Sequence, residues 1–416
     1  MSVRRLCVQW PRFGPYYLAR LKALHELLSP HGVEVIGLET AVRDETYDWR
    51  IESDPTPFRR EQVFTDRTFE QIHPREMFEA VTASLERINP DALAIHTYSF
   101  PDSRACLSWC RRRRRTAVLM TDTKEDDAKR VWWRERIKAR IIRQYDAALL
   151  SGTSSSAYFQ KLGFPKDNIF LGYDVVDNEH FRTQAESAAE DPLAYRDLPG
   201  LDSDQPFFLV SSRFIRRKNL ERLLSAYAAY SSAVDRPWRL IILGDGPLRP
   251  ELEALVAEKN ISGAEFAGFR QINEIPAYYG RASVFVHPAL TDTWALVVNE
   301  AMAARLPVLV STGAGCAADL VENGINGYTF DPTKERELAE LMTRISEPDT
   351  DLTAMGRSSQ RIIQRWSPER FSESLWAAVM KGSARSNRPL DLPTRLLLAA
   401  IRATSTSVHS HHTVEA

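Results

Sequence analysis

The chain has 416 residues, of which 44% are hydrophobic and 26% charged, and its 54 basic and 55 acidic residues leave a formal net charge of −1. This length exceeds what one hydrophobic core usually serves, so two domains are expected, and the balanced charge argues against a nucleic-acid-binding protein. No apolar run is long enough to span a bilayer and the N-terminus lacks the apolar core of a signal peptide, so a cytoplasmic protein is expected.

The N-terminal half predicts strands alternating with helices. A helix is expected from Tyr16 to Leu28, and short apolar strands at Leu6–Gln9, Val33–Leu38, Ala92–His96, Ala117–Met120 and Ala147–Leu150. Such alternation is typical of a parallel sheet covered by helices. We expect a first domain over residues 1–183 and a linker, rich in Asp, Pro and Gly, over residues 184–206.

Residues 129–143 read KRVWWRERIKARIIR and predict a basic helix with Trp133, Ile137 and Ile141 along one stripe. A helix of this kind fits peripheral contact with an anionic membrane, at its inner face. The alternative is a helix that packs inside the first domain. The arginine run at residues 111–115 is of a type that often simply faces solvent.

The C-terminal half continues the alternation. A helix from Leu296 to about Arg305 is ended by Pro307, and strands are expected at Phe207–Ser212, Trp238–Leu243, Ala282–His287 and Val308–Ser311. Five strand–helix units up to about Glu347 predict a parallel, doubly wound sheet in a second domain over residues 207–366. A helix over residues 367–383 is expected to cross back to the first domain, before a polar, partly disordered tail over residues 384–416.

Charged side chains follow two strands of the second domain. Arg213 and Lys218 come after its first strand, and seven residues separate Asp292, on a loop, from Glu300, on the next helix. Ligands bind at the carboxyl ends of strands in open α/β sheets, where cations suit a departing diphosphate and a helix N-terminus suits phosphate or sugar oxygens. The competing interpretations are acids placed at a helix start by its dipole and a charge run that faces water.

These segments resemble the donor site of glycosyltransferase family 4, the glycosyl transferases group 1, which are retaining enzymes of GT-B fold. The resemblance is strongest from Arg213 to Gly327. It implies an α/β protein with two Rossmann-like domains whose parallel sheets face a central cleft. It further implies transfer of a sugar from a nucleotide-diphosphate sugar to a hydroxyl acceptor (glycan, lipid-linked intermediate or small molecule), by front-face displacement, with no cofactor and no metal.

The resemblance also implies roles for individual residues. Glu300 would bind the ribose hydroxyls, Asp292 the transferred sugar, and Arg213 and Lys218 the diphosphate. Asp292 stands where the family has a glutamate, one methylene longer, so donor choice is expected to depend on it. The other donor-binding residues implied are Gly14, Gly244, Gly268, Phe269, Arg270, Thr293, Trp294, Ala295, Leu296 and Val297.

Many relatives carry a histidine on the loop after the strand that corresponds to Ala117–Met120, where this chain has Asp122. Asp122 is therefore a candidate for contact with donor or acceptor hydroxyls, the alternative being a loop-capping residue. His96 is a second candidate, with a structural role as its alternative. Because Asp292 and the missing histidine both depart from the family, a non-catalytic GT-B nucleotide-sugar-binding or scaffold protein is the alternative function. The four cysteines have no spacing typical of a metal or redox site.

Overall fold

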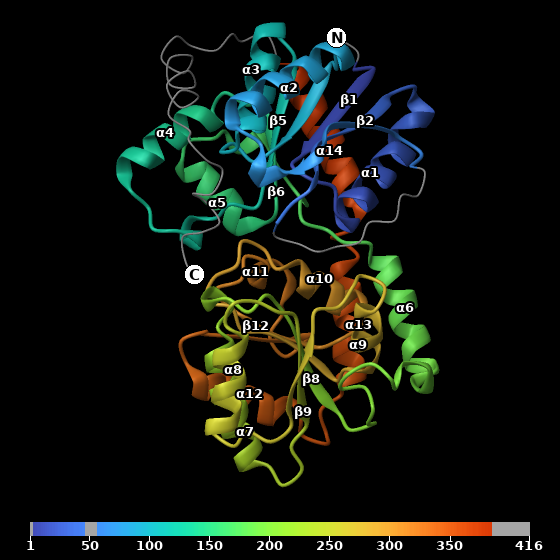
Figure 1. Cartoon of the computed structure of the whole chain (residues 1–416), viewed down its shortest axis with the longest axis vertical. Coiled ribbons are helices and arrows are strands. Elements are labelled where there is room, and N and C mark those ends of the chain that lie inside the picture. Colours follow the sequence, from blue (N-terminus) through green and yellow to red (C-terminus); the bar gives the residue numbers. More distant parts are fainter. Residues whose placement is uncertain (1–2, 46–55, 385–416) are drawn as a thin grey trace. The chain divides into compact units, whose positions relative to one another are not determined.

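A computed structural model describes residues 3–45 and 56–384 of the chain (Figure 1). The described residues form two compact units. Unit 1 comprises those up to Val175 together with those from Pro368 onward, and unit 2 comprises Val176–Ser367. Each unit is built on one parallel sheet.

The sheet of unit 1 has seven strands in the order β3-β2-β1-β4-β5-β6-β7. All neighbouring strands pair in parallel. The strands are β1 Arg5–Trp10, β2 Glu34–Arg43, β3 Arg59–Thr68, β4 Ala92–His96, β5 Thr116–Thr121, β6 Ala147–Leu150 and β7 Ile169–Leu171. The helices are α1 Pro15–Leu28, η1 Ser29–His31, η2 Phe69–Gln71, α2 Pro74–Ile88, α3 Pro101–Arg113, η3 Glu125–Asp127, α4 Trp132–Ile142, α5 Thr153–Lys161, η4 Lys166–Asn168 and α14 Pro368–Ser383.

The sheet of unit 2 has six strands in the order β10-β9-β8-β11-β12-β13, again all parallel. The strands are β8 Phe207–Ser211, β9 Arg239–Leu243, β10 Ala264–Gly268, β11 Val284–His287, β12 Val308–Ser311 and β13 Gly327–Phe330. The helices are α6 Asn178–Glu190, η5 Pro192–Tyr195, η6 Arg216–Lys218, α7 Leu220–Ala233, α8 Arg249–Glu258, α9 Ile275–Arg281, α10 Leu296–Ala303, α11 Ala317–Leu320, α12 Glu335–Ile345 and α13 Leu352–Ile363.

The central strands are mostly apolar because helices cover both faces of each sheet. Every residue of β6 and β9 is buried, and apolar side chains of the sheet and helices form a large core cluster in each unit. The predicted Rossmann-like organisation is thereby confirmed for each unit. No strand range was predicted for the edges of either sheet. These edge strands are β3, whose sequence RREQVFTDRT is mostly polar, and the short β7 in unit 1, and β10 and β13 in unit 2.

Helix α6 begins unit 2, although the sequence placed its first half in the first domain and its second half in the linker. It packs mainly against α9 and also against α10, which lie in the same unit. Helices α6 and α9 approach closely at Gly280, where an added Cβ would lie 2.2 Å from the carbonyl oxygen of Ala185. Helix α14, in contrast, packs against α1, β5 and β6 of unit 1. The predicted tail falls almost entirely outside the described residues.

No helix within the described residues combines the length and the apolar composition needed to cross a membrane.

Candidate donor site

The candidate site lies at the carboxyl ends of β8 and β11 in unit 2. These strands are neighbours, but the chain first continues from β8 to β9 and β10 on one side before it returns to β11 on the other. Such a switch in strand order opens a crevice between the two loops that follow the strands, and this is where open α/β sheets bind ligands. Arg213 and Lys218 follow β8, whereas Asp292 follows β11.

The two loops are tied together by Asn219. Its side-chain amide donates hydrogen bonds to the carbonyl oxygens of Pro288 (3.0 Å) and Pro332 (2.8 Å). Asn219 has a left-handed backbone, with φ of 61°, which ends η6 and turns the chain into α7. Asparagine tolerates this conformation better than most residues do. The turn therefore fixes Lys218, the preceding residue, beside the loop that follows β11.

Lys218 and Asp292 form an ion pair at the centre of the site. Lys218 Nζ lies 2.5 Å from Asp292 Oδ2, and the two side chains are only 12% and 10% exposed. His287, the last residue of β11, is buried beside them, with Nε2 3.1 Å from the same carboxylate oxygen. Neither ring nitrogen of His287 has a hydrogen bond of good geometry among the described residues. The structure thus brings Lys218, which is predicted to bind the diphosphate, into direct contact with Asp292, which is predicted to bind the sugar.

Burial and charge set the ionisation of this cluster. Burial by itself would raise the pKa of Asp292, but the positive charge of Lys218 and the His287 ring outweigh burial and hold that pKa well below its ordinary value. Burial lowers the pKa of Lys218, although Asp292 opposes the shift, and Arg217 and Arg213 lower it further. Burial also lowers the pKa of His287. The positive charge of Arg213 therefore reaches Lys218, as expected for two cations that follow the same strand.

The main chain holds Asp292 in place. Its N–H donates to the carbonyl of Gly313 (3.1 Å) and its carbonyl accepts from Gly315 N–H (3.0 Å). An added Cβ at Gly313 would lie 2.2 Å from the carbonyl oxygen of Leu290, so only glycine permits this approach. The loop after β12 thus supports the loop that carries Asp292.

Glu300 lies in the second turn of α10 and is 1% exposed. Its Oε2 accepts a hydrogen bond from the hydroxyl of Tyr279 (2.8 Å), which lies on α9 and also reaches the carbonyl of Val297 (3.3 Å). This contact orients the carboxylate that is predicted to bind ribose. Tyr279 was not singled out from the sequence, where it reads as one of the apolar residues of a short helix.

Residues 293–297 connect Asp292 to α10. The side chain of Trp294 is buried, donates to Asn299 Oδ1 (2.9 Å) and stacks on Trp366 with ring centres 6.1 Å apart. The Trp294 ring is thus part of the packing, and only its main chain is available for a donor. Ala295 has a φ of 89°, an unfavourable conformation for a residue with a Cβ. Thr293, Leu296 and Val297 are partly exposed along this loop and the start of α10.

Gly244 follows β9 beside the loop that carries Arg213. Its φ is 119°, and an added Cβ would lie 1.8 Å from the carbonyl oxygen of Ser212. The next loop residue, Asp245, accepts from the N–H of Phe214 through its carbonyl (2.8 Å). Gly244 therefore lets the loops after β8 and β9 pack together, which is a structural reason for a glycine here besides any contact with donor.

Gly268 is the last residue of β10, and Phe269 and Arg270 follow it at the carboxyl ends of the strands. Phe269 is 39% exposed, and an added Cβ at Gly268 would meet nothing closer than 3.9 Å. Arg270 donates to the carbonyl of Ala267 and pairs with Glu274 at 3.4 Å. Contact of these three residues with a base stays a prediction, and the Arg270 side chain already has local partners.

The predicted residues of unit 1 lie at the end of a strand or on the loop that follows one. Gly14 caps α1, and an added Cβ there would meet nothing within 4 Å. Asp122 follows β5, and its carbonyl accepts from the hydroxyl of Ser155 (3.0 Å). His96 Nδ1 lies 2.8 Å from the hydroxyl of Tyr173, a contact that supports the structural interpretation of this histidine.

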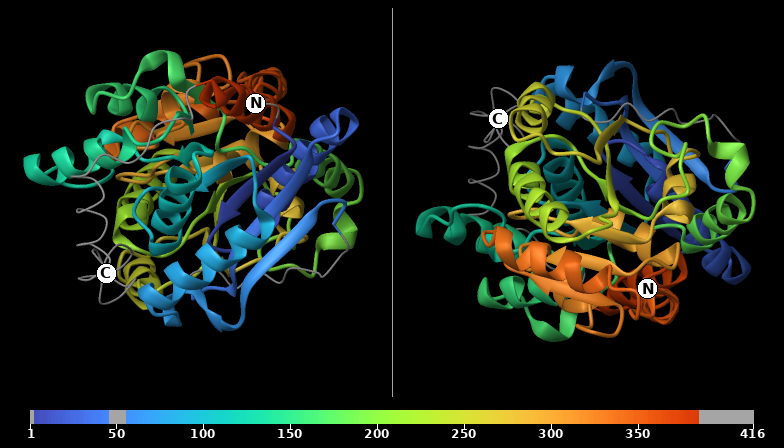
Figure 2. Two further views of the ribbon diagram at one scale, coloured as in Figure 1. Left: turned by 90° about the horizontal axis from the view of Figure 1, so that it is seen from above. Right: turned by 90° about the horizontal axis from the view of Figure 1, so that it is seen from below.

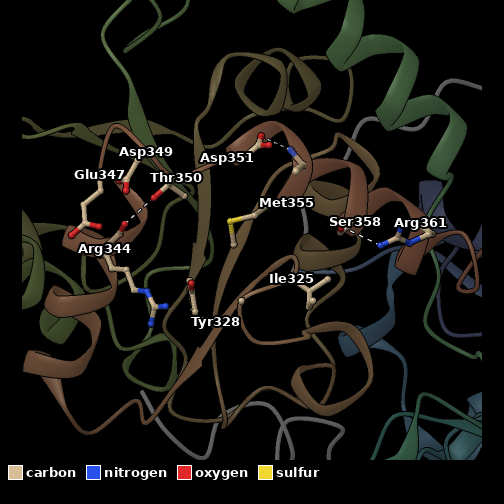
Figure 3. A pocket seen from close by; sticks show the side chains of 12 residues that line it. Ile325, Tyr328, Arg344, Glu347, Asp349, Thr350, Asp351, Met355, Ser358 and Arg361 are labelled. Carbon is tan, nitrogen blue, oxygen red and sulfur yellow. Dashed lines mark hydrogen bonds between the residues drawn. The ribbon is translucent and has the colours of Figure 1, made fainter.

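A surface depression of about 500 Å³ lies elsewhere on unit 2, between β13 and α13 (Figure 3). Tyr328, Arg344, Met355 and Arg361 line it, and none of the predicted donor residues does. No cluster of three or more His, Cys, Asp or Glu side chains suited to a metal ion occurs within the part of the chain that the structure describes.

Comparison with known proteins gives one family match. Residues 194–361, which contain the β8–β13 sheet and its loops, match the family model described as glycosyl transferases group 1. The α-monoglucosyldiacylglycerol synthase of Acholeplasma laidlawii is 27% identical over 204 residues, which cover 49% of this chain and 50% of the relative. The α-D-kanosaminyltransferase of Streptomyces kanamyceticus is 30% identical over 151 residues, 36% of this chain and 38% of the relative. The chain thus spans half or less of the length of these relatives.

Structural similarity extends over nearly the whole chain. The crystal structure of HepE from Anabaena in complex with UDP superposes with a TM-score of 0.69 at 15% identity, covering 91% of this chain and 99% of HepE. At this identity the similarity concerns the fold. It confirms the predicted GT-B fold with two Rossmann-like domains.

Proposed function

We propose that this chain, whose residues 194–361 match the family model of the glycosyl transferases group 1, transfers a sugar from a nucleotide-diphosphate sugar to a hydroxyl acceptor with retention of configuration. The observation that carries the proposal is the gathering of Arg213, Lys218 and Asp292 at the switch point between β8 and β11. Two cations and a carboxylate at this edge fit a ligand with a diphosphate at one end and hydroxyl groups at the other.

Charge stabilisation is the main task of the site. In the proposed step, the bond between the anomeric carbon and the phosphate oxygen breaks, and the acceptor oxygen bonds to the same face of that carbon. The acceptor's proton passes to the departing phosphate oxygen. Arg213 and Lys218 would stabilise the negative charge that develops there, which lowers the barrier without a metal ion or cofactor.

The ion pair of Lys218 with Asp292 is compatible with donor binding. An ammonium group has three N–H donors, so one bond to Asp292 leaves two for phosphate oxygens. The carboxylate keeps Oδ1 for a sugar hydroxyl, because Lys218 and His287 both approach Oδ2. The shorter aspartate is thus positioned by the cation that binds the neighbouring phosphate, and we propose that this coupling sets donor choice.

The resemblance to the family also assigns the other protein groups that would bind the donor. Glu300 would accept from the ribose hydroxyls, and main-chain N–H groups at the start of α10 would bind donor oxygens. Gly14 and Asp122 would contribute from unit 1. Because HepE was crystallised with UDP, uridine diphosphate sugars are the first donors to test. Peripheral contact with an anionic membrane through residues 129–143, at its inner face, stays part of the proposal.

The test is nucleotide release from a panel of nucleotide sugars by the purified full-length chain, with and without glycan and lipid acceptors. Release that depends on the donor, and that falls at least about a hundredfold in Lys218→Ala, is expected from loss of a transition-state contact. The anomeric configuration of the product, read by NMR, tests retention.

Absence of release with every donor, together with measurable nucleotide binding, would overturn the proposal. That result would favour a non-catalytic nucleotide-sugar-binding protein on the same fold. Inversion at the anomeric carbon would leave sugar transfer standing and contradict the retaining mechanism alone.

A further inference from the structure

Helix α4 exposes two adjacent tryptophans. Trp132 is 74% exposed and Trp133 46%, whereas the large aromatic side chains of both cores are buried. Exposure of a tryptophan side chain to water is unfavourable, and a patch of exposed apolar side chains typically marks a surface that binds a protein, a ligand or a membrane. Helix α4 lies at the periphery of unit 1 and protrudes from it in both views of Figure 2, in which it is coloured teal.

The opposite side of α4 anchors the helix. Ala139 and Ile142 are buried in the core of unit 1. Glu135 accepts hydrogen bonds from Lys138 Nζ (3.0 Å) and from the hydroxyl of Tyr158 on α5. Since Glu135 is the one acidic residue of α4, this arrangement turns its carboxylate inward. The exposed tryptophans are therefore held on a fixed helix rather than on a loop.

The outward face of α4 is cationic. At a helical repeat of about 100° per residue, Trp132, Trp133, Arg136 and Arg140 share one side of α4, and all four are exposed. Lys129, just before the helix, is exposed as well. The acids on the preceding turn, Glu125 and Asp126, are engaged by Lys161 and Lys124. The surface thus presents two indole rings among three cations.

We propose that the face of α4 made of Trp132, Trp133, Arg136 and Arg140, together with Lys129 just before the helix, binds the surface of an anionic lipid bilayer. This inference rests on the membrane contact included in the proposed function and assigns it to these side chains. The indole rings enter the headgroup region, where an amphipathic ring is most stable, and the cations contact lipid phosphates. A bilayer fits this face because mobile anionic headgroups adapt to the separate long cations, and the interfacial region accepts indole rings without a shaped pocket. The predicted stripe from Trp133 to Ile137 and Ile141 runs from this face into the core, where Ile141 is buried.

Co-sedimentation of the full-length chain with vesicles tests the proposal. Vesicles of phosphatidylcholine alone are compared with vesicles that also contain phosphatidylglycerol. Binding is expected only to the second kind and should weaken as salt rises. Arg136→Glu combined with Arg140→Glu should reduce binding about tenfold or more, and Trp132→Ser combined with Trp133→Ser should do the same.

Matched controls come from unit 2. Leu193→Ser removes an apolar side chain that is 67% exposed, and Arg336→Glu reverses a charge on an arginine whose side chain is 90% exposed. Both should bind vesicles as the unchanged chain does. Nucleotide release in the absence of vesicles should be the same in all variants, which separates this proposal from the proposed sugar transfer.

Three results would overturn the proposal. Equal binding to neutral and anionic vesicles would show that headgroup charge is not recognised. Unchanged binding of both double variants would place the contact elsewhere on the chain. Self-association without lipid that is lost in the tryptophan double variant would identify a second copy of the chain as the occupant of this face.

Discussion

Lys218 Nζ on the loop after β8 lies 2.5 Å from Asp292 Oδ2 on the loop after β11, so the ion pair joins the two loops that meet at the switch point of the sheet. Both side chains are largely excluded from water, where an unpaired charge is costly. The pair is therefore both a structural contact of unit 2 and the proposed meeting point of diphosphate and sugar.

Removal of one partner should cost more than removal of both. Lys218→Met is expected to destabilise unit 2 by roughly 2–4 kcal/mol, because it leaves Asp292 buried without its cation. Lys218→Met combined with Asp292→Asn should recover part of this loss, giving a coupling energy of about 1–3 kcal/mol in a double-mutant cycle measured by urea unfolding. The exposed pair Arg216–Glu221, 3.2 Å apart, is the control and should couple by less than about 1 kcal/mol. Additive effects at Lys218 and Asp292 would contradict the buried ion pair.

How far the sequence predicts this site depends on the kind of contact. Periodicity and apolar composition place β8 and β11, and with them Arg213, Lys218 and Asp292, at one edge of a sheet. The contact between Lys218 and Asp292 depends on the left-handed turn at Asn219 and on loop packing, which no periodicity encodes. His287 looks like an ordinary strand end, and the hydrogen bond from Tyr279 to Glu300 joins two helices whose approach is set by tertiary structure.

The same distinction holds for the fold. Strand β6 is apolar throughout and β4 is apolar up to His96, and both were predicted with the bounds that the structure shows. Strand β3 was not predicted because an edge strand needs little apolar surface, and its polar residues resemble those of a loop. Helix α6 was divided between domain and linker because its packing against α9 cannot be seen in its own sequence.

Stability should depend on pH through His287. Burial lowers the pKa of this ring from 6.5, so the folded state binds fewer protons than the unfolded state as the pH falls below about 6.5. The contribution of His287 to the free energy of unfolding is therefore complete above that pH. It is lost as the pH falls, and the free energy of unfolding decreases by at most about 1.4 kcal/mol per pH unit on this account. Urea unfolding of the unchanged chain and of His287→Asn, at intervals between pH 7 and pH 5, measures the difference.

The unchanged chain must be compared with the His287→Asn variant because another buried group, Asp102, changes the stability with pH in the opposite direction. Burial raises the pKa of Asp102 to about 6, so its contribution to stability falls as the pH rises through the range between 3.8 and about 6. The His287→Asn variant keeps Asp102, and the difference between the curves isolates His287. A constant difference across the pH range would show that the His287 ring titrates alike in folded and unfolded chains.

Glu300→Ala should weaken nucleotide binding by about 1–3 kcal/mol, because hydrogen bonds from the ribose hydroxyls to a carboxylate are lost. Isothermal titration with the nucleotide diphosphate measures the change. A 2′-deoxy nucleotide should bind the unchanged chain less tightly but bind Glu300→Ala about as well as the parent nucleotide does. Tyr279→Phe, which removes the 2.8 Å hydrogen bond to Glu300 but keeps the carboxylate, should have a smaller effect. If Glu300→Ala lost equal affinity for both nucleotides, the ribose assignment would fail.

Two glycines at predicted donor positions should respond differently to substitution. Gly244→Ala is expected to destabilise unit 2 by at least about 2 kcal/mol, because the added methyl group would collide with the carbonyl oxygen of Ser212 and φ is 119°. Gly14→Ser should change stability by less than about 0.5 kcal/mol, since serine also caps helices and the space around Gly14 is open. Urea unfolding measures both changes. If Gly14 contacts the donor, Gly14→Ser will reduce donor affinity without this loss of stability, whereas unchanged affinity would remove Gly14 from the site.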